Sequence, residues 1–329
     1  MKPLTFSILR LLNDGNFHSG ATLAQSLKVS RTSVSNALHG LEEIGLVVYK
    51  VRGRGYCLPE PVQWLNKDKI LKHLDTKEDL HLEILDATKS TNTVLLQRAA
   101  MEEHSSRANT ISIVATELQT KGRGRRGQLW HSGLGSSLTF SLLWNFQKGA
   151  GLLSGLSLAI GIAIIRSLKL SGIKNVALKW PNDVMSHHQK IAGILIELQG
   201  DSLGPTLSVI GIGINLKLPD KIKLNIDQKA TDLFTVSGKY QDRNKLMARL
   251  ISELITVLKK FTQHGFKPFM DEWIQYHELE NEPVTLYLPD GSIKEGVIQG
   301  VTDNGSLLLK TLSGICDFNG GNIQLRKVT

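Results

Sequence analysis

The sequence contains very little cysteine. Only Cys57 and Cys316 occur among its 329 residues, and they lie far apart in the chain. They form neither a CxxC pair nor a cluster with the spacing of metal ligands, which argues against a disulfide framework and a zinc-ribbon type of site. This usage predicts a reduced, cytoplasmic protein.

Long hydrophobic runs are also missing. The most apolar stretch, Leu156 to Leu168, is shorter than a bilayer span and contains Arg166. Polar residues interrupt the N-terminal run from Leu4 to Leu12. We therefore expect neither a signal peptide nor a membrane anchor.

Acidic residues are fewer than basic ones. Asp and Glu number 30 against 39 Lys and Arg, which gives a net charge of +9 and favours polyanionic partners such as nucleic acid or nucleotide phosphates. The 41% hydrophobic and 21% charged content is ordinary for a globular protein. A chain of this length has room for two or three domains.

The first 62 residues predict three short helices and a hairpin. Apolar residues recur at helical spacing from Leu4, Ser19 can cap a second helix, and Ser30 can cap a third that extends to Ile44. Leu46 to Val51 and Tyr56 to Leu58 would then form a wing with Arg52 and Arg54 at its tip. The pattern resembles a winged helix-turn-helix.

The third helix would present a polar face able to reach phosphates and base edges in a major groove. The predicted DNA contacts are Arg31, Thr32, Ser33, Ser35, Asn36, His39, Arg52 and Arg54. The alternative is a dimerisation or docking module whose polar face is merely solvated. Pro59 through Lys69 reads as a linker to the next domain.

The central part of the chain, residues 63–278, alternates short apolar runs with longer periodic ones, which predicts a mixed α/β layer. Expected strands are Leu82–Leu85, Thr110–Ala115, Ser137–Leu143, Val176–Leu178, Ile191–Leu198 and Leu207–Ile212. Expected helices are Thr91–Ala100, Gly155–Leu168, Arg243–Thr262 and Lys267–Tyr276.

A loop rich in glycine and arginine is the most informative feature. Gly122 to Gly127 places three glycines around three arginines, just before Trp130. Glycine permits close backbone approach to a ligand, and arginine binds phosphate or carboxylate oxygens bidentately. The loop is therefore predicted to hold an anionic ligand, with a solvated basic loop as the alternative.

Other polar segments adjoin the predicted strands. Ser90–Asn92 can cap a helix or contact a ligand, and Lys179–Asp183 should turn sharply after a strand. Period-two alternation in the strand that begins at Lys190 would place Lys190 and Gly193 on opposite faces. His187 and His188 are expected to be loop residues.

The last residues, 279–329, predict a small β-domain. Pro283–Leu288, Ser292–Val301, Ser306–Thr311 and Ile323–Leu325 are strand-like, with turns at Pro289–Gly291 and Asp303–Gly305. The pattern resembles an SH3-like barrel. About 50 residues bury little core unaided, so we expect this domain to dock on the central one.

Three segments, the Gly/Arg loop, Lys179–Asp183 and Lys190–Glu197, resemble the signature of biotin protein ligases. The likeness to bifunctional biotin protein ligases and biotin operon repressors covers nearly the whole chain, and the motifs occur in that family's order. It implies an α+β multidomain protein: a winged helix-turn-helix, a class II synthetase-like ligase domain and an SH3-like β-barrel. The implied reaction joins biotin to ATP as biotinyl-5′-AMP and then transfers biotin to a protein lysine.

The resemblance also implies roles for individual residues. Lys190, Arg125 and Asp183 would be catalytic, and Mg²⁺ would enter with ATP and contact Asp183. Biotin would be bound by Ser90, Thr91, Asn92, Gln119, Gly122, Arg123, Arg125, Lys190, Gly193 and Gly211. ATP and the adenylate would be bound by Arg123, Arg125, Arg126, Trp130, Asn182, Asn215 and Arg326.

The implied partners are the biotin carboxyl carrier protein of acetyl-CoA carboxylase, operator DNA of biotin synthesis genes, and a second copy of the chain when adenylate is bound. The dimer would form through an exposed strand, Ile191 to Leu198. Two positions depart from the family pattern: Leu216–Asp232 has no aromatic residue, and Gln128 stands where a basic residue is common. A regulator that senses biotin without catalysis and a lipoate ligase are the alternatives.

Overall fold

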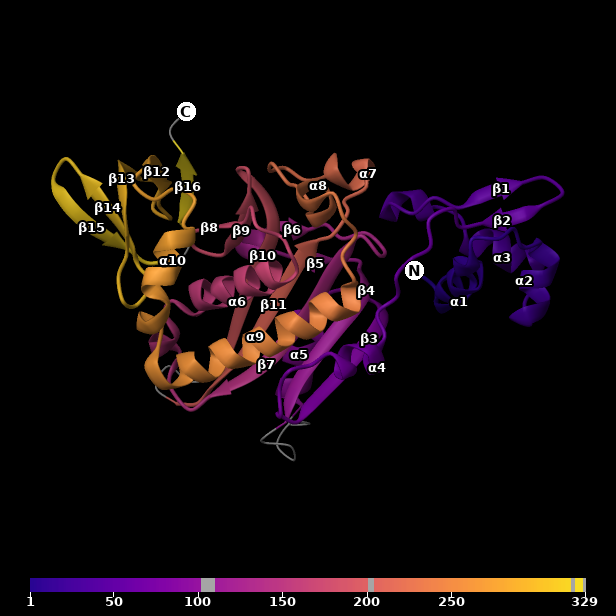
Figure 1. The fold of residues 1–329 in the computed structure, drawn as a ribbon, viewed down its shortest axis with the longest axis horizontal. Helices are drawn as coiled ribbons and strands as arrows, with labels where there is room; N and C mark the ends of the chain where they lie inside the picture. The colour runs from indigo at the N-terminus through magenta and orange to yellow at the C-terminus, as the bar shows by residue number, and fades with distance from the viewer. Residues whose placement is uncertain (102–109, 201–203, 321–322, 328–329) are drawn as a thin grey trace.

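The computed structural model describes residues 1–101, 110–200, 204–320 and 323–327. The N-terminal helices and hairpin lie at one end of an elongated molecule, and the C-terminal strands lie at the other (Figure 1). A large sheet with its helices fills the space between them.

The N-terminal elements agree with the pattern of a winged helix-turn-helix. They are α1 (Pro3–Leu11), α2 (Gly20–Ser26), α3 (Arg31–Ala37), β1 (Tyr49–Val51) and β2 (Gly55–Cys57). Ser19 accepts a hydrogen bond from the Thr22 amide and Ser30 one from the Ser33 amide, so both predicted N-caps are confirmed. Phe6, Ile8 and Leu9 are fully buried in the core beneath these helices.

The third helix is shorter than predicted. It ends at Ala37, and Leu41–Ile44 forms a separate 3₁₀ helix, η2, after Gly40 adopts a left-handed conformation with φ of 76°. Glycine takes this conformation without steric cost, which ends the helix. His39, predicted on the helix face, therefore lies in the turn after α3.

The segment Pro59–Lys69 connects the N-terminal elements to the central part, as expected, and is packed against the protein. Val62 and Leu65 are buried, and the chain enters helix α4 (Lys67–Lys72). The Leu65 amide donates to Oε1 of Glu117, which also forms a buried ion pair with Arg243 at 2.7 Å. These contacts fix the passage from the N-terminal elements to the central sheet.

The central sheet has seven strands in the order β3-β4-β7-β11-β10-β9-β8. Only β3 and β4 pair in parallel, and the other pairs are antiparallel. The strands are β3 (Leu80–Thr88), β4 (Ile111–Gln119), β7 (Ser137–Phe146), β8 (Ala177–Lys179), β9 (Asp183–Ser186), β10 (Gln189–Gly200) and β11 (Thr206–Asn215). The mixed α/β prediction is confirmed, while β9 was not among the predicted strands.

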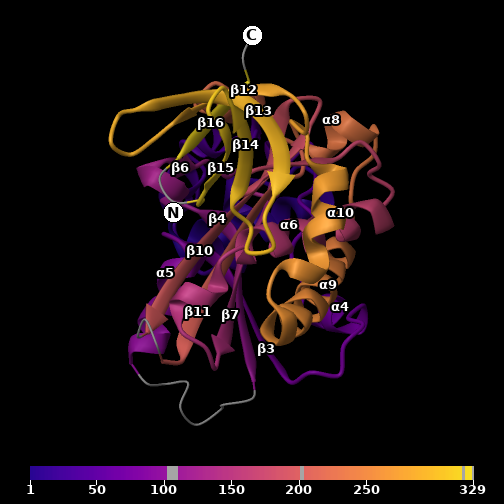
Figure 2. The ribbon, with the colours of Figure 1, turned by 90° about the vertical axis from the view of Figure 1, so that its left-hand side faces the viewer.

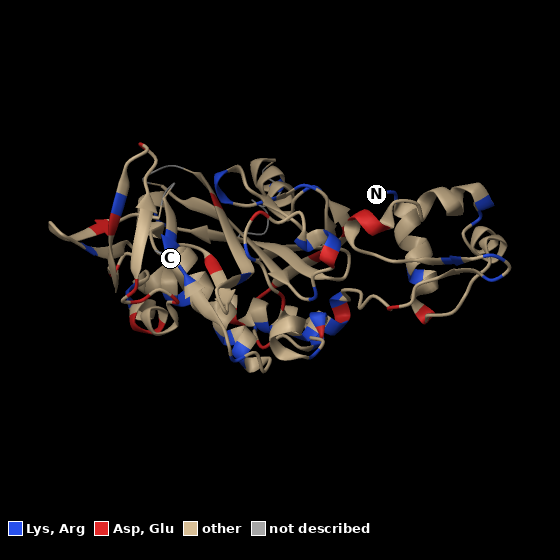
Figure 3. Cartoon of the chain, turned by 90° about the horizontal axis from the view of Figure 1, so that it is seen from above, with Lys and Arg blue, Asp and Glu red and all other residues tan. Residues whose placement is uncertain are grey.

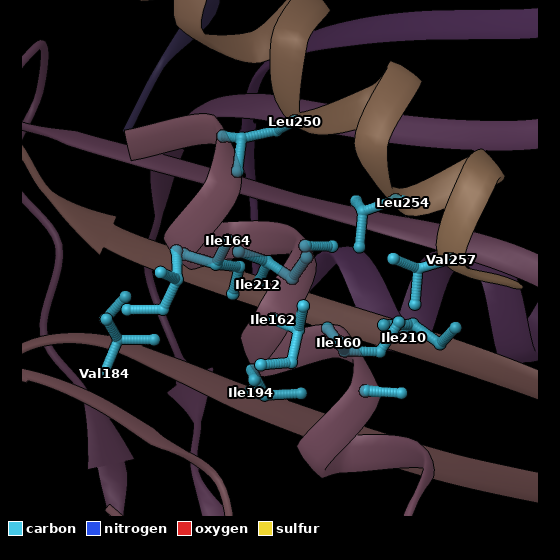
Figure 4. Packing of buried hydrophobic residues seen from close by; sticks show 14 of the residues in the cluster. Ile160, Ile162, Ile164, Val184, Ile194, Ile210, Ile212, Leu250, Leu254 and Val257 are labelled. Atoms are coloured by element: carbon cyan, nitrogen blue, oxygen red, sulfur yellow. The ribbon is translucent and has the colours of Figure 1, made fainter. Parts of the chain in front are cut away.

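Helices cover both faces of this sheet. Helix α5 (Thr91–Ala100) packs on one face through Leu95, and α6 (Leu156–Leu170) and α9 (Arg243–His264) pack on the other (Figure 2). Ile160, Ile162 and Ile164 of α6 meet sheet residues and the underside of α9 (Figure 4). The main hydrophobic core therefore lies between the sheet and these two helices.

Helix α6 belongs to the only described stretch that is long and apolar enough to cross a membrane. This stretch, Ala150–Leu170, has a mean hydropathy of 1.8, and 67% of its most apolar part is buried inside the protein. The run Leu156–Leu168 is too short to span a bilayer, as expected, but the longer stretch Ala150–Leu170 is long enough to do so. The structure uses the helix as the centre of the core.

The C-terminal strands form a five-stranded antiparallel sheet in the order β15-β14-β13-β12-β16. They are β12 (Pro283–Tyr287), β13 (Ile293–Val301), β14 (Leu307–Thr311), β15 (Gly314–Phe318) and β16 (Gln324–Lys327). Helix α10 (Met270–Tyr276) precedes them. The indole nitrogen of Trp180 donates to the Gly305 carbonyl at 3.2 Å, and Val284 and Leu309 join the main core, which confirms the predicted docking.

Candidate active site

One cavity of about 220 Å³ opens where the central sheet, the Gly/Arg loop and the C-terminal sheet meet. Its walls come from sequence segments that lie far apart in the chain. The lining includes Ser90, Thr91, Asn92, Gln119, Arg123, Arg125, Arg126, Trp130, Asn182, Asp183, Lys190, Gly193 and Gly211, all of them predicted site residues. The three motifs of the sequence therefore converge on one site.

The Gly/Arg loop forms one wall. It runs from β5 (Gly122–Arg123) through a 3₁₀ turn (Arg125–Gly127) to β6 (Leu129–Trp130), and Arg126 has a left-handed φ of 57°. Arg125 donates to Oδ1 of Asn182 at 3.1 Å and to the carbonyl of Gly320. Burial lowers the pKa of Arg125, a tendency that Asp183 opposes and Arg126 reinforces. A half-buried guanidinium remains charged at neutral pH and offers donors to an anion.

Lys190 and Asp183 lie at the inner end of the cavity. The Lys190 ammonium nitrogen is 2.7 Å from Oδ1 of Asp183 and 6.0 Å from the centroid of the Trp130 ring. The side chains are only 14% and 21% exposed, so their charges are little screened by water. The site thus places a partly buried cation within reach of a bound anion.

The predicted alternation along β10 is wrong. The register between β9 and β10 shifts between Lys190 and Ala192, a β-bulge that turns Lys190 toward the same side as Gly193. An ideal Cβ on Gly193 would lie 3.2 Å from the Lys190 ammonium, and both residues line the cavity. Ile191 and Ala192, in contrast, are fully buried in the core.

Two glycines of β11 make room for side chains. A Cβ on Gly213 would lie 2.3 Å from the indole of Trp130, and a Cβ on Gly211 would lie 2.2 Å from Oδ1 of Asn92. Neither distance is sterically allowed. The flat backbone of β11 therefore lets an aromatic ring and an amide lie directly against the sheet.

Hydroxyl and amide groups at the start of α5 form a hydrogen-bonded network. The Thr91 amide donates to Oε1 of Gln119 at 2.8 Å, and Ser141 donates to Thr91 at 2.6 Å and to Asn92 at 2.5 Å. Ser90 makes no side-chain cap for α5. These side chains therefore form a polar wall of the cavity instead of capping the helix. The network holds their hydrogen-bond donors and acceptors in fixed positions.

Three predicted site residues do not line the cavity. Gly122 packs behind it, where a Cβ would lie 2.3 Å from the Trp130 carbonyl. Asn215 is buried and donates to the carbonyl oxygens of Lys190 at 3.4 Å and Thr231 at 3.0 Å. Arg326 lies on β16 over the Tyr287 ring, while its neighbours Gln324 and Leu325 line the cavity.

Sequence reasoning also missed residues of this site. Ser141 sits within a strand that reads only as apolar core, and Glu197 accepts hydrogen bonds from Arg123 and Asn92. Lys179 was noted only as part of its motif, yet it lines the cavity, as does Gln228 of the segment Leu216–Asp232. A polar residue facing inward on a buried strand was the available signal for Ser141.

The segment Leu216–Asp232 reaches the site through its backbone. The Lys190 amide donates to the Lys229 carbonyl at 2.9 Å, and the Thr231 amide donates to the Lys190 carbonyl at 2.9 Å. Its short helix α7 (Asp220–Lys223) lies against η2 of the N-terminal elements. One segment therefore touches both the lysine of the cavity and the N-terminal elements.

The predicted DNA-contacting residues lie on the N-terminal elements, away from the cavity. Arg31, Thr32, Asn36 and His39 are exposed, whereas Ser33 and Ser35 are half-buried. Arg52 and Arg54 occupy the β1–β2 turn, and the Arg54 guanidinium stacks on Phe17 at 4.1 Å. Lys and Arg positions are visible on the N-terminal elements at one end of the molecule (Figure 3). These positions are open to a large partner.

Together these features define a class of protein in which a cavity lined by lysine and arginine side chains is joined to a winged helix-turn-helix. The profile of the Biotin/lipoate A/B protein ligase family matches residues 84–215, the HTH domain profile matches 5–57, and the Biotin protein ligase C terminal domain profile matches 281–326. Each match falls on one of the three regions of the structure.

Similar proteins agree with these profiles. The bifunctional ligase/repressor BirA of Salmonella typhimurium is 37% identical over 98% of this chain and 97% of its own length, and that of Bacillus subtilis is 29% identical over 94% of both. A biotin protein ligase from Aquifex aeolicus, solved in complex with biotin and ATP, covers 75% of this chain and 99% of its own, with 28% identity and a TM-score of 0.61. The chain belongs to the family of bifunctional ligase/repressor BirA proteins.

Proposed function

We propose that this protein attaches biotin to a lysine of the biotin carboxyl carrier protein of acetyl-CoA carboxylase. In the first step, a carboxylate oxygen of biotin attacks the α-phosphorus of ATP, the bond to the bridging oxygen breaks, and pyrophosphate leaves. In the second step, the amine of the acceptor lysine attacks the carbonyl of biotinyl-5′-AMP, and AMP leaves. The relatives named as ligases and the Aquifex structure with biotin and ATP support this reaction.

The main obstacle to the first step is repulsion between two anions. Unit charges about 4 Å apart repel by roughly 4 kcal/mol at an effective dielectric of about 20, which corresponds to about a thousandfold in rate. The single observation that carries the proposal is that Lys190 and Arg125 line the same cavity. Their positive charges would lie between the carboxylate and the α-phosphate and stabilise the charge that develops there.

The remaining polar groups would orient the two substrates. Arg123 and Arg126 would hold phosphates and retain the adenylate, while the network around Thr91 and Gln119 would bind the ureido group of biotin. The Trp130 indole over Gly213 supplies an apolar wall for the ring system. Asn182, fixed by its own hydrogen bond to the Ile194 carbonyl at 2.9 Å, would contact the nucleotide.

Mg²⁺ would enter with ATP. Among the described residues there is no group of three or more His, Cys, Asp or Glu that could hold a metal ion. Asp183 lines the cavity, and its Oδ1 is buried 2.7 Å from the Lys190 ammonium nitrogen. One such carboxylate beside phosphate oxygens fits the usual coordination of Mg²⁺, which would neutralise phosphate charge. Asp183 would also orient the acceptor lysine in the second step.

We further propose that the adenylate-bound protein represses biotin synthesis genes as a cytoplasmic homodimer that grips a palindromic operator. The expected dimer strand, Ile191–Leu198, needs correction: residues up to Gly193 pair with both β9 and β11. Within β10, the part from Leu195 to Gly200 has one edge that no strand pairs, and at Ile194 the amide still donates to the Asn182 carbonyl at 3.1 Å. That edge would be the site at which a second copy adds its own strand.

Pyrophosphate release tests the catalytic part. The protein is incubated with MgATP and either biotin or lipoate, and we expect release with biotin to exceed release with lipoate by at least tenfold. Equal or greater release with lipoate would identify the other branch of the ligase family. Release with neither acid would leave the protein without the proposed ligase activity.

A gel-shift titration with a biotin-gene operator tests repression. Biotin plus ATP should increase the affinity, and Arg52→Ala should lower the slope of log affinity against log salt by about 0.9, the value for one lost phosphate contact. Lys174→Ala, an exposed position on the central part, is the matched control and should leave the slope unchanged. No effect of biotin and ATP would contradict adenylate-dependent repression.

A further inference from the structure

Glu197 connects the Gly/Arg loop to the wall of the cavity. Its Oε2 accepts from Nη2 of Arg123 at 2.7 Å and from Nδ2 of Asn92 at 2.8 Å. Both donors line the cavity, whereas Glu197 lies behind them on β10. The carboxylate therefore touches two site residues without facing the ligand space itself.

The other bonds of Asn92 fix which way its amide points. Oδ1 accepts from Ser141 at 2.5 Å, and Nδ2 also reaches the Leu195 carbonyl at 3.2 Å. Gly211 leaves the space that the amide occupies, since a Cβ there would lie 2.2 Å from Oδ1. Glu197 is thus held at a fixed place by a rigid neighbour on α5.

Arg123, in contrast, sits on a loop and is 43% exposed. A guanidinium carries five N–H donors, so one bond to Glu197 leaves donors for a second anion. The ion pair anchors the guanidinium at the cavity rim before any ligand arrives, which reduces the conformational entropy lost when a carboxylate or phosphate binds.

We infer that Glu197 is a positioning residue: it tethers Arg123, and with it the Gly/Arg loop, to the cavity wall for binding the acid substrate. The expected effect of Glu197 on KM for biotin rests on the proposed ligase function. The structural consequence, a loop held in place in the ligand-free protein, does not depend on that function.

The first experiment measures the tether without substrate. Trypsin cleaves after arginine, and the loop contains Arg123, Arg125 and Arg126. In the full-length ligand-free protein, Glu197→Ala should speed cleavage within this loop about fivefold, the scale expected for losing a partly exposed ion pair. The control is Glu83→Ala, which breaks a similar ion pair between Glu83 (32% exposed) and Arg98 (28% exposed). This variant should not change the rate of cleavage within the loop.

The second experiment measures the kinetic consequence by pyrophosphate release. Glu197→Ala should raise KM for biotin about fivefold and change kcat less than twofold, whereas Glu83→Ala should change neither. In an Arg123→Ala background, Glu197→Ala should have no further effect on KM, because the two residues act as one unit. Glu197→Gln, whose amide oxygen still accepts a hydrogen bond, should restore part of the affinity.

The outcomes separate the two claims. If the wild-type protein releases no pyrophosphate, the ligase proposal fails, and the trypsin result still decides whether the tether exists. If the wild type is active but Glu197→Ala leaves cleavage unchanged, or its effect on KM adds to that of Arg123→Ala, the role of Glu197 is overturned.

Discussion

The ammonium nitrogen of Lys190 lies 2.7 Å from Oδ1 of Asp183, and the two side chains are only 14% and 21% exposed. The opposite charges are therefore in direct contact at the wall of the cavity. This ion pair holds the ammonium beside the space where a substrate anion would bind.

Replacing Lys190 removes the cation that would lie between the two substrates. Lys190→Gln should lower the rate of adenylate formation by about a hundredfold or more, because a preorganised charge acts most strongly where charge develops. Circular dichroism should show an intact fold, and Lys174→Gln on the exposed surface should keep the wild-type rate. A rate for Lys190→Gln within threefold of wild type would remove Lys190 from the mechanism.

A methyl group on Gly213 would collide with the Trp130 indole. Gly213→Ala should push the ring off the sheet and weaken biotin binding about tenfold, measured by isothermal titration calorimetry. Gly151→Ala is the matched control, since a Cβ at Gly151 meets nothing within 4 Å. Unchanged affinity in Gly213→Ala would mean that the ring does not form the wall of the biotin site.

The buried pair of Glu117 and Arg243 should matter for stability rather than for chemistry. Both side chains are almost fully buried, at 1% and 2% exposure. Glu117→Gln leaves the arginine charge unpaired and should lower the free energy of unfolding by about 3 kcal/mol in urea denaturation. Glu78→Gln breaks the exposed pair with Lys259 and should cost under about 1 kcal/mol. Equal effects of the two variants would contradict this assignment.

Asp14 should make the fold sensitive to acid. A hydrogen bond from the Asn16 amide, with a second from His18, lowers the pKa of Asp14 from 3.8 to about 2. A carboxyl with a lowered pKa stabilises the fold above its unfolded pKa, and this contribution is lost as the pH falls through the folded value.

The melting temperature should accordingly exceed that of Asp14→Asn above about pH 4, and the difference should vanish toward pH 2. Asp317→Asn, at an exposed carboxylate of β15, should show no such trend. A difference between wild type and Asp14→Asn that stays constant from pH 5 to pH 2 would refute the link to Asp14.

Local patterns predicted most of the elements. Capping serines, helical spacing and strand-like runs located α1, α2 and the main strands, because short-range side-chain and backbone effects decide those features. The motifs also predicted that Arg125, Asp183 and Lys190 belong to one site, and the structure brings them to one cavity. Their chemical roles stay predictions.

Other features depend on contacts that no local pattern encodes. The bulge after Lys190 brings Lys190 and Gly193 to the same side of β10, and it lies in the pairing with β9, a strand that was not predicted. Arg326 was placed near the nucleotide by resemblance alone; in the structure it lies over the Tyr287 ring, and its role in nucleotide binding stays a prediction. The contact between Glu197 and Arg123 joins residues that lie far apart in the sequence, so no local pattern could predict it.

Transfer of biotin to its acceptor tests the central claim most directly. The protein is incubated with biotin, MgATP and a biotin carboxyl carrier domain, and the intact mass of the carrier is measured. The account predicts that the carrier gains one biotinyl group with the wild-type protein and none within the same time with Arg125→Ala or Lys190→Gln. An unchanged carrier mass with the wild type, or equal modification by all three proteins, would contradict it.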